Sequence, residues 1–278
     1  MSVRLTLKRV PALRVDLRGV TPAALQGLST ARIERLTVTH GMQTLALAEF
    51  FAVARDDADE AADELVFEGE LARFDRIGWQ LTDGRIVVEG SAGDYVGACM
   101  SGGEVHVRGS AGLLAACEMA GGKLRIDGDV GDYAASSLPG SMDGMRGGTL
   151  IVHGNAGERF GDRMRRGTAL VHGGAGAFLG SRMVAGTIGV GGSVGAHAGF
   201  GMRRGSIVFA EAGAALPEGV GSALTFVPNR AATPVFWALL ARDLARHGGL
   251  FSDLPARRIE RHLGDLSADG KGELITCL

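Results

Sequence analysis

A short apolar pattern returns along the central part of the chain. In each copy, two apolar residues stand two positions apart, and a closing residue follows two positions later. This alternation predicts a short strand with one face turned inward. The apolar pairs are Ile86/Val88, Val105/Val107, Leu124/Ile126, Leu150/Val152, Ala169/Val171, Ile188/Val190 and Ile207/Phe209.

The closing residues define a repeat of 19 positions. They are Gly90, Gly109, Gly128, Gly154, Gly173, Gly192 and Glu211. One interval is 26 long and holds seven extra residues within "GDYAASSLPGSMDGMRGG". A unit of this length is too short for a strand and an ordinary helix, so each unit should consist of strands and turns that stack in parallel. The sequence therefore predicts an all-β fold, a right-handed parallel β-helix of about seven coils of ~19 residues.

Methionine occupies one slot of the repeat, nine positions before the closing residue. An unbranched side chain that returns to one inward position predicts a stacked internal ladder that fills a narrow core. A glycine three positions after this slot suits the turns, because glycine readily adopts positive φ. The ladder residues are Met100, Met119, Met145, Met164, Met183 and Met202, with Leu81 in the first unit.

The repeat is flanked by segments of different character. We expect an N-terminal cap over 1–66, the β-helix over 67–211 and a C-terminal helical extension over 212–278. The cap should be mixed, with a strand in "VRLTLKRV" and a short helix opened by Thr21. In the extension, "TPVFWALLARDLARHGG" predicts an amphipathic helix capped by Thr233 and ended by Gly248. Its expected buried stripe is Val235, Phe236, Leu239, Leu240 and Leu244, and we expect a second helix in "LPARRIERHLG".

Composition narrows the class of protein. Glycine provides 45 of 278 residues, yet 46% of the chain is hydrophobic, which argues against a disordered glycine-rich tract. A formal net charge of −2 does not indicate a protein that binds nucleic acid or membranes through overall positive charge. The three cysteines form no C-x-x-C pair, and neither a secretion signal nor a membrane span is visible. We therefore expect a cytoplasmic protein with reduced thiols.

The residues offer little catalytic chemistry. His153 and His172 stand in one column of adjacent units, but no third ligand at metal-site spacing joins them. Cys99 and Cys117 fit small core or corner positions better than a redox pair. The stretch "GGAGAFLG" lacks the helix and the acidic residue of a dinucleotide site. We expect no catalytic residue and no metal site on this chain.

One surface feature remains as a candidate binding site. Arginines gather at one corner of the later units, where the early units carry Cys99, Ser101, Glu118 and Ala120. The planar guanidinium pairs bidentately with carboxylates, so this patch could bind acids. Arginines bonded to turn carbonyls and local acids are an equally good interpretation. The candidate residues are Arg146, Arg163, Arg165, Arg166, Arg182, Arg203 and Arg204.

Several of these motifs resemble a known family, the C-type subunit of formylmethanofuran dehydrogenase. Its repeats read GDYVGAxMxGGxIxVxG and DRMRRGTIxVxG, and this chain has "GDYVGACMSGGEVHVRG" at 93–109, "GDRMRRGTALVHG" at 161–173 and "GMRRGSIVFAE" at 201–211. The tail "FVPNRAATPVFWALLARDLARHGGLF" is most similar to the bacterial branch, the formyltransferase/hydrolase complexes of methylotrophs. The resemblance covers all of the repeat units.

The resemblance implies a role in one-carbon metabolism. Such complexes move a formyl group from formyl-tetrahydromethanopterin to a methanofuran-type carrier and release formate. The partners would be the zinc-dependent, amidohydrolase-like A-type subunit, the B-type subunit and the D-type formyltransferase. The C-type subunit would hold no cofactor and would be a non-catalytic scaffold. Because the carriers bear oligoglutamate tails, the arginine patch is expected to meet that tail or an acidic partner surface.

Other functions stay open at the level of sequence. The complex could be the redox-active tungsten or molybdenum form, because the deciding subunit is a different chain. A glutamate-synthase-like spacer module shares the glycine pattern but belongs to longer chains. A stand-alone β-helical enzyme fits less well, because an acyltransferase of this type has coils of about 18 residues with six-residue periodicity.

Overall fold

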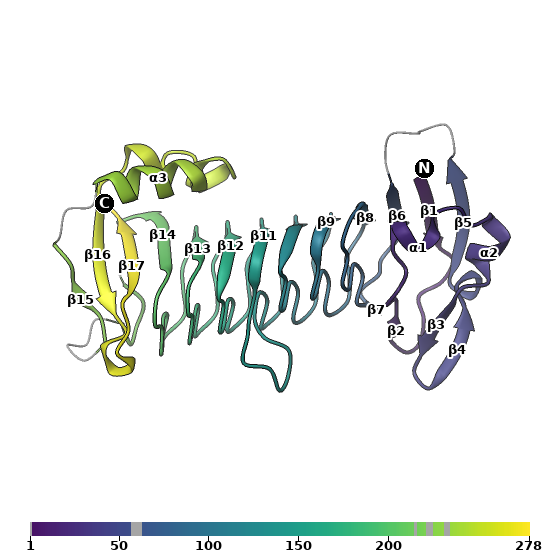
Figure 1. Ribbon diagram of the computed structural model, residues 1–278, viewed down its shortest axis with the longest axis horizontal. Coiled ribbons are helices and arrows are strands. Elements are labelled where there is room, and N and C mark those ends of the chain that lie inside the picture. The colour runs from purple at the N-terminus through teal and green to yellow at the C-terminus, as the bar shows by residue number, and fades with distance from the viewer. Residues whose placement is uncertain (1, 57–62, 214–215, 221–224, 231–233) are drawn as a thin grey trace.

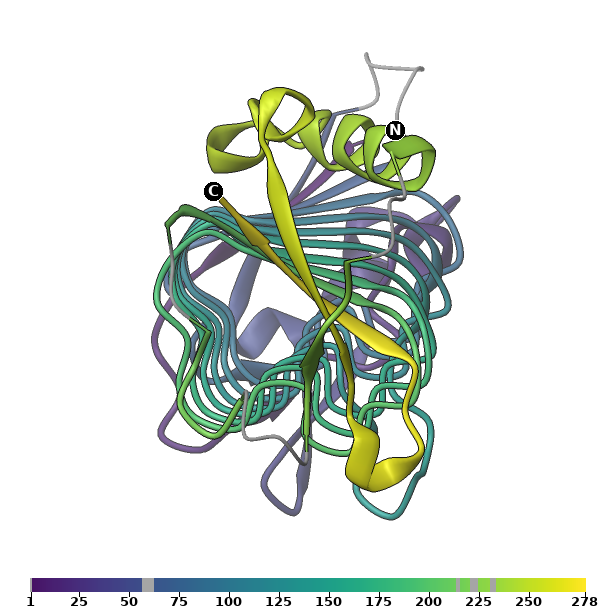
Figure 2. The ribbon, with the colours of Figure 1, turned by 90° about the vertical axis from the view of Figure 1, so that its left-hand side faces the viewer.

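The computed structural model describes residues 2–56, 63–213, 216–220, 225–230 and 234–278. The chain is mostly β, with one long and mostly parallel sheet and a C-terminal helix (Figure 1). Successive turns of the chain overlie one another when the molecule is viewed from its end (Figure 2). The parallel stacking that the repeat predicts is confirmed, whereas the handedness and the number of coils stay predictions.

The central run of the parallel sheet contains one strand from each of the seven repeat units, preceded by β6 (Glu64–Glu68). The repeat strands, in spatial and chain order, are β8 (Arg85–Glu89), β9 (Ser101–Val107), β10 (Gly121–Ile126), β11 (Arg146–Val152), β12 (Arg166–Val171), β13 (Thr187–Val190) and β14 (Ser206–Ala212). The register aligns equivalent residues, so Leu124 lies beside Val105 on one side and Leu150 on the other. The apolar pairs therefore form continuous inward rows.

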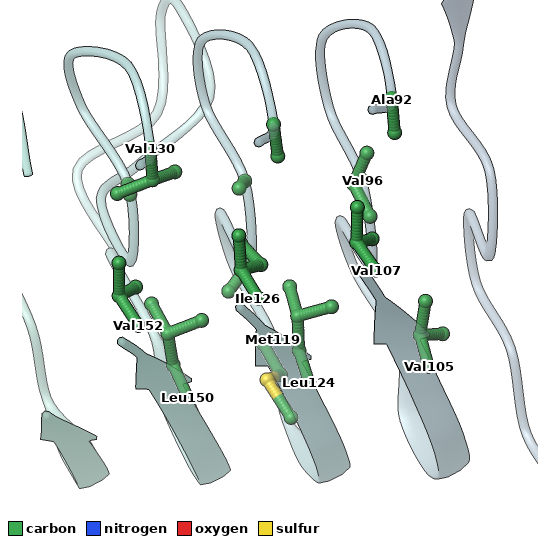
Figure 3. Close-up of a cluster of buried hydrophobic side chains, with 14 of the residues drawn as sticks. Ala92, Val96, Val105, Val107, Met119, Leu124, Ile126, Val130, Leu150 and Val152 are labelled. Atoms are coloured by element: carbon green, nitrogen blue, oxygen red, sulfur yellow. The ribbon is translucent and has the colours of Figure 1, made fainter. Parts of the chain in front are cut away.

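A second row of backbone bridges runs along the opposite side of each turn. These parallel bridges join, one after another, Leu71, Ala92, Ala111, Val130, Ala156, Ala175 and Val194. Figure 3 shows the core between the two rows, with Val105, Val107, Leu124 and Ile126 of the sheet facing Ala92 and Val130 across the interior. Each turn is thus hydrogen-bonded to its neighbours on two sides, and the apolar side chains fill the space between.

The glycine three positions after the methionine slot makes room for the methionine of the preceding turn. Gly148 has φ +78°, and a Cβ added there would lie 2.7 Å from Cε of Met119. At Gly205, with φ +97°, it would lie 2.8 Å from Cε of Met183. The ladder methionines Met100, Met119, Met145, Met164, Met183 and Met202 are all fully buried. The fixed spacing of glycine and methionine is therefore a packing contact that recurs in most of the turns, although at Gly122 the nearest atoms are backbone.

The N-terminal segment continues the large sheet and adds a smaller one. β1 (Ser2–Leu7) pairs in parallel with β6, and β5 (Phe51–Asp56) pairs antiparallel with β1 at that edge. The predicted short helix is present as α1 (Pro22–Leu25), where the Thr21 hydroxyl accepts a hydrogen bond from the Ala24 amide. The remaining elements are β2 (Val15–Asp16), α2 (Thr30–Glu34), β3 (Thr37–His40), β4 (Gln43–Ala46), η1 (Leu47–Glu49) and β7 (Phe74–Asp75), of which β4, β3, β2 and β7 form the second sheet in that order.

The C-terminal segment is mixed rather than helical, so the expectation of two helices there is wrong. The first helix exists as α3 (Pro234–Ala245), but the second does not, because residues 254–264 form a 3₁₀ turn followed by β16 (Ile259–Gly264). β16 pairs antiparallel with β17 (Gly272–Cys277), which pairs in parallel with β14. Strand pairing with the end of the sheet overrides the helical pattern of this stretch. Short elements complete the segment: β15 (Val227–Pro228), η2 (Gly249–Phe251), η3 (Leu254–Ala256) and η4 (Leu266–Ala268).

Helix α3 packs on the outer face of the sheet with a stripe that agrees with the expected one only at Leu240 and Leu244. Trp237, Ala241 and Leu244 are buried against a cluster that includes Leu170 and Val208 of the sheet. The spacing i, i+4, i+7 places the three on one helix face, and the Trp237 indole donates to the backbone carbonyl of Arg257. Leu240 is partly buried there, whereas Val235, Phe236 and Leu239 are exposed. The proposed N-cap residue, Thr233, lies outside the described residues.

Two stacked imidazoles lie where the C-terminal segment meets the sheet. The ring centroids of His153 and His172 are 4.6 Å apart, and those of His172 and Phe251 are 5.1 Å apart with the two rings edge to face. Nε2 of each histidine is buried and has no hydrogen-bond partner among the described residues. Burial, followed by the charges of His153, Arg125 and His247, lowers the pKa of His172 to about 4.

Replacing Gly148 by alanine should destabilise the stack more than the same change at an open glycine. Both Gly148 and Gly140 have positive φ, but a Cβ at Gly140 meets nothing within 4 Å. We expect Gly140→Ala to lower the free energy of unfolding by about 1 kcal/mol from backbone strain. Gly148→Ala adds overpacking against Met119 and against the backbone of Gly121 and Gly122, which lies 2.8 Å from the added Cβ, for a total of about 3 kcal/mol. Denaturant unfolding followed by circular dichroism measures both losses, and equal losses would contradict close packing at Gly148.

The lowered pKa of His172 makes stability depend on pH in acid solution. An unfolded histidine titrates near 6.5 and the folded His172 near 4, so between these values the unfolded chain binds more protons. Stability should be fully present above pH 6.5 and should fall as the pH drops toward 4. His172→Phe keeps an aromatic ring without the titration and should flatten this decline. The measurement is the urea midpoint of unfolding of both proteins from pH 7.5 to 4.5. The same fall in midpoint with pH for the His172→Phe variant and the unmodified protein would refute the role of His172.

Candidate functional site

Five of the seven predicted arginines line one groove. Its volume is about 600 Å³, and Val184 and Ala185 form the rest of its lining. Each arginine follows a buried ladder methionine by one or two positions, at or just before the first residue of a strand. The arginines of the groove are Arg146, Arg165, Arg166, Arg203 and Arg204.

The five guanidinium groups differ in their partners. Nη2 of Arg165 lies 2.5 Å from Oδ1 of Asp143, and Nη2 of Arg146 lies 3.9 Å from Oε2 of Glu118. The structure gives no ion pair for Arg166, Arg203 or Arg204 within the ranges it describes, and all three are exposed. Because arginine stays protonated, three unpaired positive charges share one hollow. Such a hollow favours anions, above all carboxylates that pair with guanidinium groups in bidentate fashion.

The other two predicted arginines belong to a separate hydrogen-bond network. Asp162 is almost fully buried and accepts hydrogen bonds from the Ser181 hydroxyl and from Nε and Nη2 of Arg182. Arg163 donates to the backbone carbonyl of Ser141 at 3.1 Å and lies 3.6 Å from Asp162. For Arg163 and Arg182, bonding to a local acid and a turn carbonyl is therefore the interpretation that the geometry supports.

The seven extra residues of the long repeat unit create a pocket that the sequence reasoning missed. The pocket has a volume of about 490 Å³, and residues 137–142 form one wall. Leu114 and Tyr133 form another part of the lining, with Asp162, Arg163 and Arg182 beside them. The signal was the insertion itself, since extra residues at a repeat corner must project from the stack.

A row of planar side chains passes along the same corner of the stack. Tyr133, Arg159 and Phe178 occupy equivalent positions of successive turns, each with φ near +60°. The Arg159 guanidinium lies 5.9 Å from the Tyr133 ring centroid and 4.5 Å from that of Phe178, and the His197 ring stacks on Phe178 at 5.0 Å. Cation–π and stacking contacts between turns hold Tyr133 in place at the pocket.

The remaining chemical candidates are reported for the described residues only. Within these, no group of three or more His, Cys, Asp or Glu side chains is placed to hold a metal ion. Burial is the main cause of a raised pKa for the thiols of Cys99, Cys117 and Cys277, which disfavours the reactive thiolate. The stretch "GGAGAFLG" is followed by turns and β13. Among the described helices, none is long and apolar enough to cross a membrane.

Sequence comparisons find relatives over part of the chain. No family model matches it. The C-type subunit of the tungsten-containing formylmethanofuran dehydrogenase 2 of Methanothermobacter thermautotrophicus is 38% identical over 98 residues, 35% of this chain and 36% of that protein. The C-type subunit of the formyltransferase/hydrolase complex Fhc of Methylorubrum extorquens is 42% identical over 80 residues, 29% of each chain. These alignments span about a third of the curated relatives.

A structural comparison extends the similarity to nearly the whole chain. A chain of the crystal structure of the formyltransferase/hydrolase complex FhcABCD from Methylorubrum extorquens, in complex with methylofuran, matches with a TM-score of 0.85. The two chains are 39% identical, and the match covers 98% of each. With the motifs, the curated relatives and the full-length match in agreement, the chain belongs to the family of C-type subunits of formylmethanofuran dehydrogenase.

Proposed function

We propose that this chain is the C-type subunit of a formyltransferase/hydrolase complex and serves there as a non-catalytic scaffold. The observation that carries the proposal is the match over 98% of both chains to a chain of the FhcABCD complex. The complex would transfer formyl from formyl-tetrahydromethanopterin to a methanofuran-type carrier and release formate. Its zinc would be held by the amidohydrolase-like A-type subunit, and the B-type and D-type subunits would complete the assembly.

The shape of the molecule supports a scaffold. The parallel strands form one extended stack, with β1 and β5 added at one end and β16 and β17 at the other. Added strands at both ends shield the core and the edges that would otherwise pair with other chains. The long lateral faces stay available for partners, which is how stacked-repeat proteins bind.

The arginine groove supplies a specific contact within this role. Arg166, Arg203 and Arg204 lack ion pairs within the described part of the chain, and carboxylates are their natural partners. We assign the groove to carboxylate binding, either of the oligoglutamate tail of the carrier or of an acidic surface of another subunit. The pairing of Arg165 with Asp143 already balances one of the positive charges of the groove.

A second candidate function follows from the archaeal relatives. The C-type subunit of the molybdenum-containing formylmethanofuran dehydrogenase 1 of Methanosarcina barkeri is 37% identical over 96 residues, 34% of this chain. The chain could thus serve a redox-active complex of the tungsten or molybdenum type. The scaffold role is the same in both, and the redox chemistry would lie on another subunit.

Affinity purification of the tagged chain from its native host tests the proposal directly. We expect stoichiometric partners, formyl transfer from formyl-tetrahydromethanopterin and formate release in the eluate, with neither activity in the isolated chain. Metal analysis and a formate-oxidation assay of the same eluate separate the two candidates. Recovery of a lone chain without partners would contradict membership of such a complex.

Neutralising the unpaired arginines should weaken carboxylate binding without unfolding the chain. The variant replaces Arg166, Arg203 and Arg204 by alanine, and we expect at least a tenfold loss of affinity for the carrier or for the partner subunits, because charge-assisted pairs are lost. A matched control replaces the exposed residues Arg9, Arg32 and Arg35, which changes the net charge equally at the N-terminal end. Equal affinities of the two variants, measured by calorimetry or co-purification, would contradict a role for the groove.

A further inference from the structure

The pocket formed by the insertion and the arginine groove are neighbours on one corner of the stack. Arg163 lines the pocket, and Arg165, two positions later, lines the groove. Arg182 and Val184 repeat this relation in the next turn. Two residues of extended chain span about 7 Å, so a single short segment of a partner could reach both hollows.

The pocket is suited to an apolar side chain. Leu138, Pro139 and Met142 of the insertion line it together with Leu114 and Tyr133. The Met142 side chain is 68% exposed and that of Tyr133 41% exposed, so large apolar surfaces face the solvent there. Removing such surface from water is favourable, and a volume of about 490 Å³ lies within the range of ordinary ligand pockets.

The charged groups beside the pocket are already paired. The Asp162 carboxylate is satisfied by Ser181 and Arg182, and Arg163 donates to the Ser141 carbonyl. They therefore offer little to an acidic ligand, unlike the three unpaired arginines of the groove. The insertion divides the two environments, because residues 137–142 form a wall of the pocket while Asp143 pairs with Arg165 in the groove.

We infer that this two-part surface binds an extended acidic segment of a partner protein, which inserts one large apolar side chain into the pocket and sets carboxylates against Arg166, Arg203 and Arg204. The inference rests on the carboxylate-binding role proposed for the groove and adds the apolar anchor. The positive charge of the groove favours acidic residues in the segment, and the apolar pocket favours one large apolar side chain between them. A purely acidic tail has no side chain to fill the pocket, so the geometry favours a protein segment.

Two synthetic peptides test the inference on the full chain. One has the sequence Glu-Glu-Gly-Phe-Gly-Glu-Glu, the other replaces its phenylalanine by glycine, and hexaglutamate serves as a purely acidic probe. We expect the phenylalanine peptide to bind about tenfold more tightly than the glycine peptide, from burial of one aromatic side chain. The double variant Leu138→Ser with Met142→Ser should abolish this difference while leaving hexaglutamate binding unchanged.

A control variant carries Val10→Ser with Met42→Ser, two exposed apolar residues at the N-terminal end, and should keep the tenfold difference. Circular dichroism confirms that the variants fold alike. Equal binding of the phenylalanine and glycine peptides overturns the apolar anchor but leaves carboxylate binding by the groove intact. Failure of all three probes to bind overturns both, whereas co-purification with partner subunits tests membership of the complex independently.

Discussion

The contact between a glycine of one turn and the methionine of the preceding turn is the constraint on which the stack depends. At Gly148 and Gly205 a Cβ would fall within 2.8 Å of a methionine Cε. The ladder methionines are fully buried, so neither side of the contact can change size without moving a neighbour. The same contact recurs at Gly167 with Met145 and at Gly186 with Met164, where the added Cβ would lie 3.0 and 3.1 Å from Cε, whereas the nearest atoms at Gly122 are backbone. This repeated fit limits how closely most of the turns can approach one another.

Periodicity predicts the parts of this chain that repeat and fails where the repeat stops. The inward rows and the parallel pairing follow from seven aligned copies, each supporting the others. Beyond them, residues 259–264 have a helical pattern but form β16, because a strand partner is present in β17. The helical pattern alone also does not identify the buried face of α3. Val235 and Leu239 are exposed whereas Trp237 and Ala241 are buried, because the position of the sheet decides which face is covered.

The candidate site shows the same division. Five of the seven arginines that the repeat aligns share one groove, but repeat position does not indicate which arginines already have a partner. Asp162 accepts hydrogen bonds from Arg182, which lies in the next turn and 20 positions later in sequence, so this pairing becomes apparent only in the folded structure. The pocket could not be predicted for a related reason. An insertion in the sequence indicates where a loop leaves the stack, but not which residues the loop will contact.

The insertion also shows how this architecture accommodates new surface. Before and after residues 137–142 the turns keep the same alignment from Thr149 onward, where β11 pairs with both β10 and β12 in matching register, and Met145 remains fully buried. The extra length is absorbed at a corner, where it disturbs neither the hydrogen-bonded rows nor the core. Insertions at such corners therefore leave the core and the strand pairing unchanged. A family built on this stack can acquire different binding surfaces while its interior stays constant.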